Sequence, residues 1–200
     1  MPSNTQLSLT NHTDPAPLLR RATRQLLTYE RNDGVALSAT LFLPPNYRQG
    51  ERLPVLIWAY PREFTNRQAA SQMRGSQHRF TEFRGASHLF LLTQGYAVVD
   101  GPSMPIIGSG ETANDTFIEH LVPSASAVID TVVDLGVADR DTIIIGGHSY
   151  GAFMAANLLA HSDLFQAGIA RSGAYNRTLT PFGFQNERRT FWQAQDVYTK

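Results

Sequence analysis

The sequence predicts an α/β fold, in which helices cover both faces of a mostly parallel sheet. Short apolar runs rich in β-branched residues recur along the chain and have the length of buried strands. Segments whose apolar residues follow a helical spacing alternate with these runs. A glycine-rich hexapeptide at 146–151 joins an isoleucine-rich run to one of the helical segments. Strand and helix therefore alternate through most of the chain.

The first elements are two extended segments and a buried strand. Residues 25–31 and 35–43 flank an Asn-Asp-Gly sequence that is typical of a hairpin turn. Residues 54–59 form a short continuous apolar run, which fits a strand buried on both faces. Residues 61–84 are polar and rich in arginine, and we expect a long functional loop there.

The middle of the chain contains two helices and one strand. Residues 87–94 predict a helix that ends at Gly95, and residues 96–100 predict the next buried strand. A Gly/Pro loop follows at 101–110, before apolar residues at helical spacing between 117 and 135.

The helix over 117–135 carries its own boundary signals. Asn114 or Asp115 can cap its first turn, and Gly136 ends it. Pro123 should kink or restart the helix, because proline lacks the N–H that the helix needs. The last elements are a strand at 142–145, a helix at 150–161 and a short strand at 167–170.

Composition excludes several classes of protein. The 17 basic side chains balance the 17 acidic ones, so nothing in the charge favours nucleic acid or an anionic membrane as a partner. There are no cysteines, which excludes disulfides and thiolate metal sites. No apolar run is long enough to span a membrane, and the N-terminus lacks signal-peptide order, so we expect a soluble, by default cytoplasmic, chain.

The strongest chemical signal is Gly-Gly-His-Ser-Tyr-Gly at 146–151. It contains Gly-x-Ser-x-Gly between a strand and a helix, which is the context of a nucleophile elbow in an α/β-hydrolase fold. Ser149 must adopt a strained conformation at such a sharp turn, so Gly147 and Gly151 must lack bulk. We therefore predict that Ser149 is a nucleophile.

An oxyanion needs two hydrogen-bond donors near this serine. The backbone N–H of Tyr150, at the start of the helix, is the expected first donor. Tyr60 directly follows the buried strand, where its hydroxyl could be the second donor. The alternative is a strand-end tyrosine whose hydroxyl lies in water.

A triad also needs a histidine base and a carboxylate, which in this fold follow the serine in sequence. The only later histidine is His161, about three helical turns of 5.4 Å from Ser149. His148 is sterically unsuited to act on its neighbour, and we expect the histidines of the central chain to lie on the surface or in loops, namely His78, His88 and His120. The base and its carboxylate are therefore expected outside this chain.

The segment Gly-Gly-His-Ser-Tyr-Gly-Ala-Phe-Met-Ala-Ala-Asn-Leu-Leu-Ala-His at 146–161 resembles the active-site segment of the prolyl oligopeptidase family of serine peptidases. The stretch Ile-Ala-Arg-Ser-Gly-Ala-Tyr-Asn-Arg-Thr-Leu-Thr-Pro-Phe-Gly-Phe-Gln-Asn-Glu at 169–187 is similar to the glutamyl endopeptidase branch, found in bacteria and plant chloroplasts. Ala-Tyr-Pro-Arg-Glu-Phe at 59–64 and Pro-Ile-Ile-Gly at 105–108 support that branch. The resemblance covers roughly residues 25–198.

The resemblance implies roles for particular residues. It makes Tyr60 the second oxyanion donor, and it places the pocket for the residue before the scissile bond in the loop over 172–189. A pocket for Glu needs a buried cation, for which Arg177 is the candidate, although it could equally be a surface arginine. It also implies a β-propeller before the hydrolase domain, and a triad Asp and His beyond residue 200.

We therefore expect a flexible leader or linker remnant over 1–24 and a C-terminally incomplete α/β-hydrolase domain over 25–200. The predicted function is hydrolysis of peptide bonds, after Glu, through an acyl-enzyme on Ser149. The expected partner is a peptide or protein substrate, and no metal or organic cofactor is implied. Two alternatives remain: an esterase or lipase that uses the same elbow, and a non-catalytic fragment or binding module.

Overall fold

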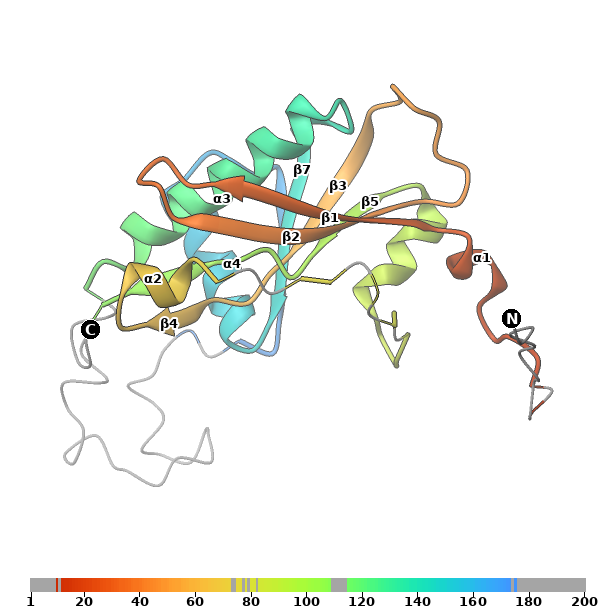
Figure 1. Ribbon diagram of the computed structural model, residues 1–200, viewed down its shortest axis with the longest axis horizontal. Helices are drawn as coiled ribbons and strands as arrows, with labels where there is room; N and C mark the ends of the chain where they lie inside the picture. The colour runs from red at the N-terminus through yellow and green to blue at the C-terminus, as the bar shows by residue number, and fades with distance from the viewer. Residues whose placement is uncertain are drawn as a thin grey trace, which may run out of the picture.

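The protein is described by a computed structural model at residues 10, 12–72, 75–76, 78, 80–81, 83–108, 115–173 and 175. Its centre is a six-stranded sheet with the order β1-β2-β5-β3-β7-β8 (Figure 1). In that order the strands are Thr23–Glu30, Ala36–Leu43, Ala97–Asp100, Leu53–Trp58, Ala138–His148 and Ala167–Arg171. β5, β3, β7 and β8 pair in parallel, whereas β2 is antiparallel to β1 and β5. This is the mostly parallel sheet that the sequence predicts.

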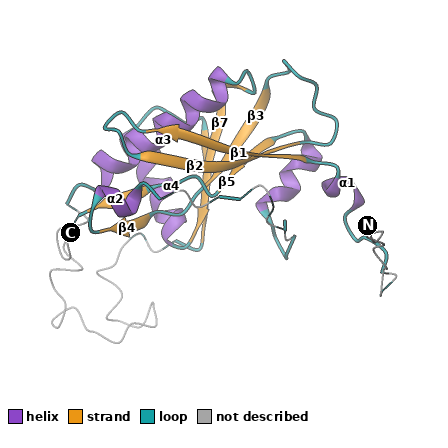
Figure 2. Cartoon of the chain, viewed as in Figure 1, coloured by secondary structure: helices purple, strands orange, loops and turns teal. Residues whose placement is uncertain are grey.

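Helices cover both faces of the sheet. α3 (Phe117–Asp134) and α4 (Tyr150–His161) contribute to the larger apolar core, on the face that carries Val55 and Ile57 of β3. α1 (Pro17–Arg20) and the 3₁₀-helix η1 (His88–Gln94) close a smaller core on the other face, around Leu56. Figure 2 shows the α3–α4 pair and the α1–η1 pair at opposite ends of the view.

The first elements of the chain follow the predicted order closely. β1 and β2 form the expected hairpin, with Gly34 at φ 85° in its turn. η1 begins after Ser87, whose hydroxyl accepts the N–H of Leu89, and it ends at Gly95 with φ 83°. The last residues of the expected leader are structured instead of loose, because α1 and the start of β1 lie before residue 25 and Leu19 is only 4% exposed.

Two segments that were expected to be loops contain short elements. β4 (Arg62–Phe64) and β6 (Pro105–Ile107) form a second, two-stranded parallel sheet. α2 (Arg67–Ala70) follows β4, and the side chain of Asn66 caps its first turn. Elements of three or four residues are too short to produce a sequence period, which explains why the polar composition alone predicted loops.

α3 differs from its prediction at two points. It continues through Pro123 as one helix of 18 residues, so the proline neither ends nor restarts it. Its N-cap residue is Thr116 instead of Asp115, while Asn114 lies outside the described residues. Leu121 and Ala125 are fully buried on either side of the proline, and this packing holds both halves of the helix on the sheet.

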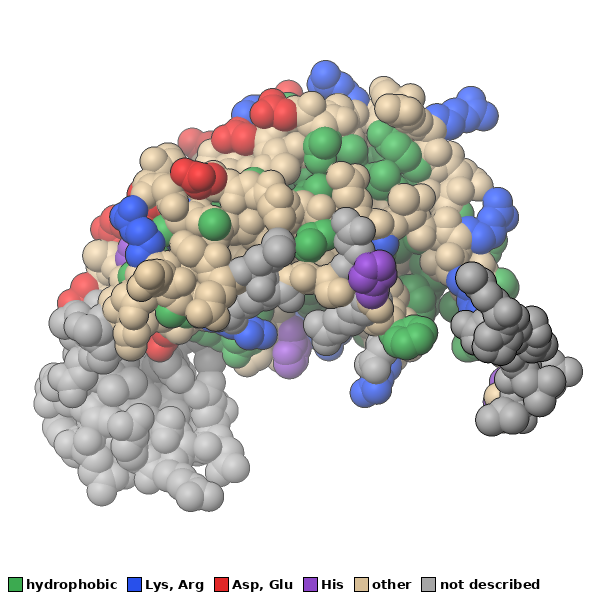
Figure 3. Space-filling view, in the orientation of Figure 1, with side chains coloured by type: hydrophobic (Ala, Val, Ile, Leu, Met, Phe, Trp, Pro, Cys, Tyr) green, Lys and Arg blue, Asp and Glu red, His purple; other side chains and the backbone are tan. Residues whose placement is uncertain are grey.

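The surface carries both signs of charge. Figure 3 shows arginines spread around the visible face, with acidic side chains mainly toward the α3 side. None of the helices in the described ranges is long and apolar enough to cross a membrane.

Candidate active site

Ser149 lies at a sharp turn between a strand and a helix. β7 ends at His148 and α4 begins at Tyr150, so Ser149 alone connects them. Its backbone has φ 58° and ψ −117°, which places a non-glycine residue in a sparsely populated region. The strained strand–turn–helix geometry predicted from the Gly-x-Ser-x-Gly motif is therefore present.

The glycines of the motif allow very close packing. A Cβ on Gly147 would lie 2.4 Å from the Gly151 carbonyl and 2.7 Å from the carbonyl oxygen of Ala59. A Cβ on Gly151 would lie 2.4 Å from the same Ala59 oxygen. Since real Cβ atoms do not approach backbone this closely, both positions exclude any larger residue. The elbow thus rests on the end of β3.

Backbone hydrogen bonds hold both sides of the serine. The Ser149 N–H donates to the Arg171 carbonyl at 2.9 Å, which ties the elbow to the end of β8. The Ser149 carbonyl accepts the N–H groups of Ala152 at 3.0 Å and Phe153 at 3.2 Å, the first bonds of α4. The helix N-terminus behind the serine therefore carries the positive end of the helix dipole, which favours developing negative charge.

Tyr60 lies beside this turn. It directly follows Ala59, whose N–H donates to the Gly146 carbonyl at 2.9 Å, and its side chain is 49% exposed. Its ring meets the Tyr150 ring edge to face, with centroids 5.9 Å apart and planes at 80°. The structure thus brings Tyr60 and Tyr150, two predicted site residues, into contact.

One neighbour of this pair was not predicted. The Tyr150 hydroxyl donates to Oε1 of Glu63 at 3.4 Å, so a carboxylate of β4 reaches the elbow helix. Glu63 is close to Tyr60 in sequence, but only the fold brings it to Tyr150. No local pattern in the sequence reports such a contact.

No histidine hydrogen-bonds the Ser149 side chain within the described part of the chain. His161 ends α4, the helix that starts after the serine, and His148 is exposed on the elbow itself. This arrangement agrees with a base that does not come from either residue.

His88 differs from its prediction as a surface or loop residue. Its Nε2 lies 2.6 Å from Oδ1 of Asp100, and its ring stacks on Trp58 at 4.7 Å with planes 8° apart. The side chain is only 19% exposed. It lies on the face of the sheet that η1 covers, and it holds η1 against the ends of β3 and β5.

His120 is a half-buried residue of α3. Its Nδ1 accepts the N–H of Ile107 at 3.3 Å. Desolvation, and then the nearby charge of Arg31, lower the pKa of His120. It is a packed structural histidine, again in contrast to the prediction of a surface or loop residue.

Arg177, the candidate cation for a Glu pocket, lies outside the described residues, as does most of the loop over 172–189. Arg62 of β4 is described and exposed near Tyr60. Across the described ranges, no three His, Cys, Asp or Glu side chains gather in a way that could hold a metal ion.

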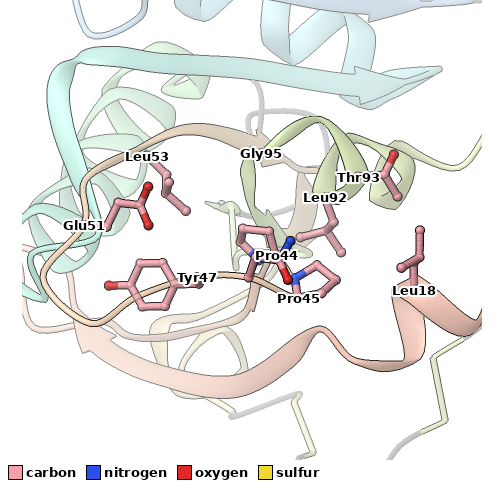
Figure 4. Close-up of a pocket in the computed structure, with 10 residues that line it drawn as sticks. Leu18, Pro44, Pro45, Tyr47, Glu51, Leu53, Leu92, Thr93 and Gly95 are labelled. Carbon is pink, nitrogen blue, oxygen red and sulfur yellow. The ribbon is translucent and has the colours of Figure 1, made fainter.

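A pocket of about 210 Å³ lies away from the elbow (Figure 4). It opens beside Leu53, the first residue of β3, whereas Ser149 follows the last residue of the parallel strand β7. The pocket and the serine therefore lie at opposite ends of the parallel strands. Its lining is Leu18, Pro44, Pro45, Asn46, Tyr47, Glu51, Leu53, Leu92, Thr93 and Gly95.

The mixed sheet, its strand order and the strained serine together define an α/β-hydrolase fold with a nucleophile elbow. Residues 119–199 match the model of the prolyl oligopeptidase family. This match confirms the predicted resemblance for that part of the chain.

Known proteins with similar sequence are named for one activity. The chain is 54% identical over 196 residues to a probable chloroplastic glutamyl endopeptidase of Arabidopsis thaliana, and covers 20% of that protein with 96% of its own length. It is 52% identical over 203 residues to the probable chloroplastic glutamyl endopeptidase of Oryza sativa subsp. japonica, with 100% of the chain covering 22% of the relative. The chain thus spans about a fifth of the length of these relatives.

Solved structures support the fold. An acylaminoacyl peptidase in complex with Z-Gly-Gly-Phe-chloromethyl ketone matches 93% of this chain with a TM-score of 0.59. The match covers 29% of that protein at 21% sequence identity. At this level of identity the likeness concerns the fold.

Proposed function

We propose that this chain supplies the nucleophile and the oxyanion donors of a serine peptidase. The observation that carries the proposal is Ser149, held at φ 58° between β7 and α4. Ser149 attacks the carbonyl carbon of the scissile peptide bond, and the resulting tetrahedral intermediate carries a negative oxygen. Collapse of the intermediate expels the amine and leaves an acyl-enzyme, which water hydrolyses.

Two groups stabilise the oxyanion in this proposal. The Tyr150 N–H lies in the first turn of α4, where the backbone favours negative charge. The Tyr60 hydroxyl is the second donor, and the contact of Tyr60 with the ring of Tyr150 supports this role. Removal of one such donor lowers kcat by a factor of about 10²–10³ in serine hydrolases.

The general base and its carboxylate come from outside these 200 residues. No histidine in the described part of the chain hydrogen-bonds the Ser149 side chain, which supports this view, as do the positions of His161 and His88. The 200-residue chain alone should then be nearly inactive, because loss of triad members lowers kcat by about 10⁴–10⁶.

The proposed substrate is a peptide or protein cleaved after Glu. The relatives are named glutamyl endopeptidases, and a pocket for a Glu carboxylate needs a cation that offsets its lost hydration. Arg177 remains the proposed cation.

A fluorophosphonate probe tests the nucleophile. We expect the full-length peptidase that carries this chain to react at Ser149, to lose the label in Ser149→Ala, and to keep it in Ser162→Ala. Ser162 is a suitable control because it caps the other end of α4. The 200-residue chain should react far more slowly. Full labelling of Ser149→Ala, or peptide turnover by the 200-residue chain at the full-length rate, would refute the proposal.

The same preparation separates a peptidase from an esterase. A peptidase hydrolyses both a Glu-containing peptide and an activated ester of the same residue, and it loses both activities in Ser149→Ala. Turnover of esters alone would assign the elbow to ester hydrolysis.

A further inference from the structure

Tyr150 touches the loop that carries Tyr60 at two separate points. Its ring packs edge to face on Tyr60, and its hydroxyl donates to Glu63. Tyr60 lies in the connection between β3 and β4, and Glu63 lies in β4. One side chain of the elbow helix therefore spans this connection.

Tyr150 is itself held in place by aromatic packing. Its ring stacks on Phe117 of α3, with centroids 5.8 Å apart and planes at 28°. It also stacks on Phe153, one turn further along α4, at 6.1 Å and 21°. Phe117 is 8% exposed, so this stack belongs to the core. The packing thus anchors the Tyr150 ring to the elbow, and the hydrogen bond from its hydroxyl to Glu63 ties the segment that carries Tyr60 to this anchored ring.

Tyr60 has fewer restraints of its own. It is 49% exposed, and within the described part of the chain its hydroxyl makes no hydrogen bond to another residue. The backbone around it is anchored, by Ala59 to Gly146 on one side and by the Arg62 N–H to the Met104 carbonyl at 3.1 Å on the other. The backbone is therefore fixed, while the direction of the phenol depends on the side chains that touch it.

We propose that Glu63 and the side chain of Tyr150 are positioning residues that aim the Tyr60 hydroxyl at the oxyanion. This inference rests on the proposed function. An oxyanion donor is effective only within about 2.7–3.1 Å of the developing charge, so a ring that swings loses most of its effect. Tyr150 would then contribute to both oxyanion donors. Its backbone N–H is the first donor, and its ring positions the Tyr60 hydroxyl, which is the second.

A double-mutant cycle in the full-length peptidase tests the inference. Glu63→Leu and Tyr150→Phe should each lower kcat about threefold to tenfold with KM within about twofold, as a fraction of the donor's effect is lost. In a Tyr60→Phe background, the same changes should cost less than about twofold, because the group they position is absent. Glu63→Gln retains an acceptor for the Tyr150 hydroxyl and should restore most of the kcat.

Glu51→Leu is the control, since it removes a carboxylate that lines the pocket at the opposite end of the parallel strands. It should leave kcat unchanged. Equal losses in the wild-type and Tyr60→Phe backgrounds would overturn the positioning role and leave the proposed function intact. Full activity of Tyr60→Phe would overturn both the oxyanion role of Tyr60 and the positioning role. Activity in Ser149→Ala would instead refute the nucleophile.

Discussion

Arg31 and Asp33 form a two-pronged ion pair across the turn of the β1–β2 hairpin. Arg31 Nε lies 2.8 Å from Oδ1 of Asp33, and a terminal guanidinium nitrogen lies 2.9 Å from Oδ2. The other terminal nitrogen of Arg31 donates to Ser124 Oγ at 3.2 Å and to the His120 carbonyl at 3.3 Å. The Arg31 side chain is only 2% exposed. The hairpin is thus joined to α3 through a buried charge.

This pair predicts an acid-sensitive contribution to stability. The hydrogen bond from Arg31 lowers the pKa of Asp33 from 3.8 to about 2 in the folded protein. The contribution is therefore present above pH 3.8 and is lost as the pH falls through 2. Asp33→Asn should lower the free energy of unfolding by about 1–2 kcal/mol at pH 6, a value reduced by solvent screening of the partly exposed carboxylate. Urea denaturation at several pH values should show the difference shrinking toward pH 2.

Asp139→Asn is the matched control for that experiment. Asp139 pairs with Arg52 on the surface, where both side chains are about half exposed. Such pairs contribute about 0–1 kcal/mol. A pH-independent difference for Asp33→Asn, or an equal effect of both variants, would contradict the buried role of Arg31.

Tyr29→Phe should stabilise the protein. The Tyr29 hydroxyl is buried and has no hydrogen-bond partner within the described residues. Burial also raises the pKa of this phenol well above its ordinary value. Removing an unsatisfied buried hydroxyl should raise the free energy of unfolding by about 1 kcal/mol. Tyr175→Phe, which removes an exposed hydroxyl bonded to the Ala170 carbonyl at 3.4 Å, should bring no gain. A loss of stability in Tyr29→Phe would show that the hydroxyl has a partner.

The backbone strain at Ser149 predicts that replacing this serine by glycine stabilises the protein. Ser149→Gly should raise the free energy of unfolding by about 1–2 kcal/mol, because glycine tolerates the φ of 58°. Ser149→Ala keeps the Cβ and should keep most of the strain. Thermal melts of both variants measure the difference. If alanine and glycine gave the same melting temperature, the elbow would not be strained.

The outer edge of β8 predicts self-association of the 200-residue chain. β8 lies at the end of the sheet order and all of its residues are exposed in the described structure, with Ile169 at 40%. Exposed apolar edge strands pair with other chains. Ile169→Lys should therefore shift the chain toward monomer in analytical ultracentrifugation, while Leu135→Lys, at the end of α3, should not. A wild-type chain that is already monomeric at high concentration would contradict this prediction.

The proposed role of Arg177 predicts that the full-length peptidase prefers Glu over Gln before the scissile bond. Arg177→Met should lower kcat/KM for Glu substrates by about 10²-fold and affect Gln substrates far less, because removing one partner of a buried charge pair costs about 2–5 kcal/mol. Arg188→Met, in the same loop, is the control. An unchanged Glu/Gln ratio would place the cation elsewhere, and Arg62 would be tested next. A preference for Pro or apolar residues would refute cleavage after Glu.

The parts of the fold with strong local signals could be predicted from sequence. The Asn-Asp-Gly turn fixed the hairpin, the Ile-rich run and Gly-x-Ser-x-Gly located the elbow, and α4 has the predicted bounds of 150–161. Pro123 does not restart the helix, one of the two outcomes the sequence predicted, because core packing outweighs a local helix defect.

Contacts between distant segments were not visible in the sequence. His88 looked like a surface residue because its partners, Trp58 and Asp100, come from the ends of two strands outside its own helix. Glu63 meets Tyr150 for the same reason. The elbow was therefore predictable as a motif, whereas the side chains that support its surroundings required the fold.

The contact between Ala59 and the two glycines of the elbow has a consequence for biosynthesis. The strained serine is supported by the end of β3, a segment made long before the motif, and strained backbone persists only where its surroundings hold it. The peptide around Ser149 cannot maintain this shape while it is still separate from the sheet. A newly made chain therefore acquires the elbow geometry that the proposed nucleophile requires only after β3 and β7 have paired, so the turn forms together with the sheet.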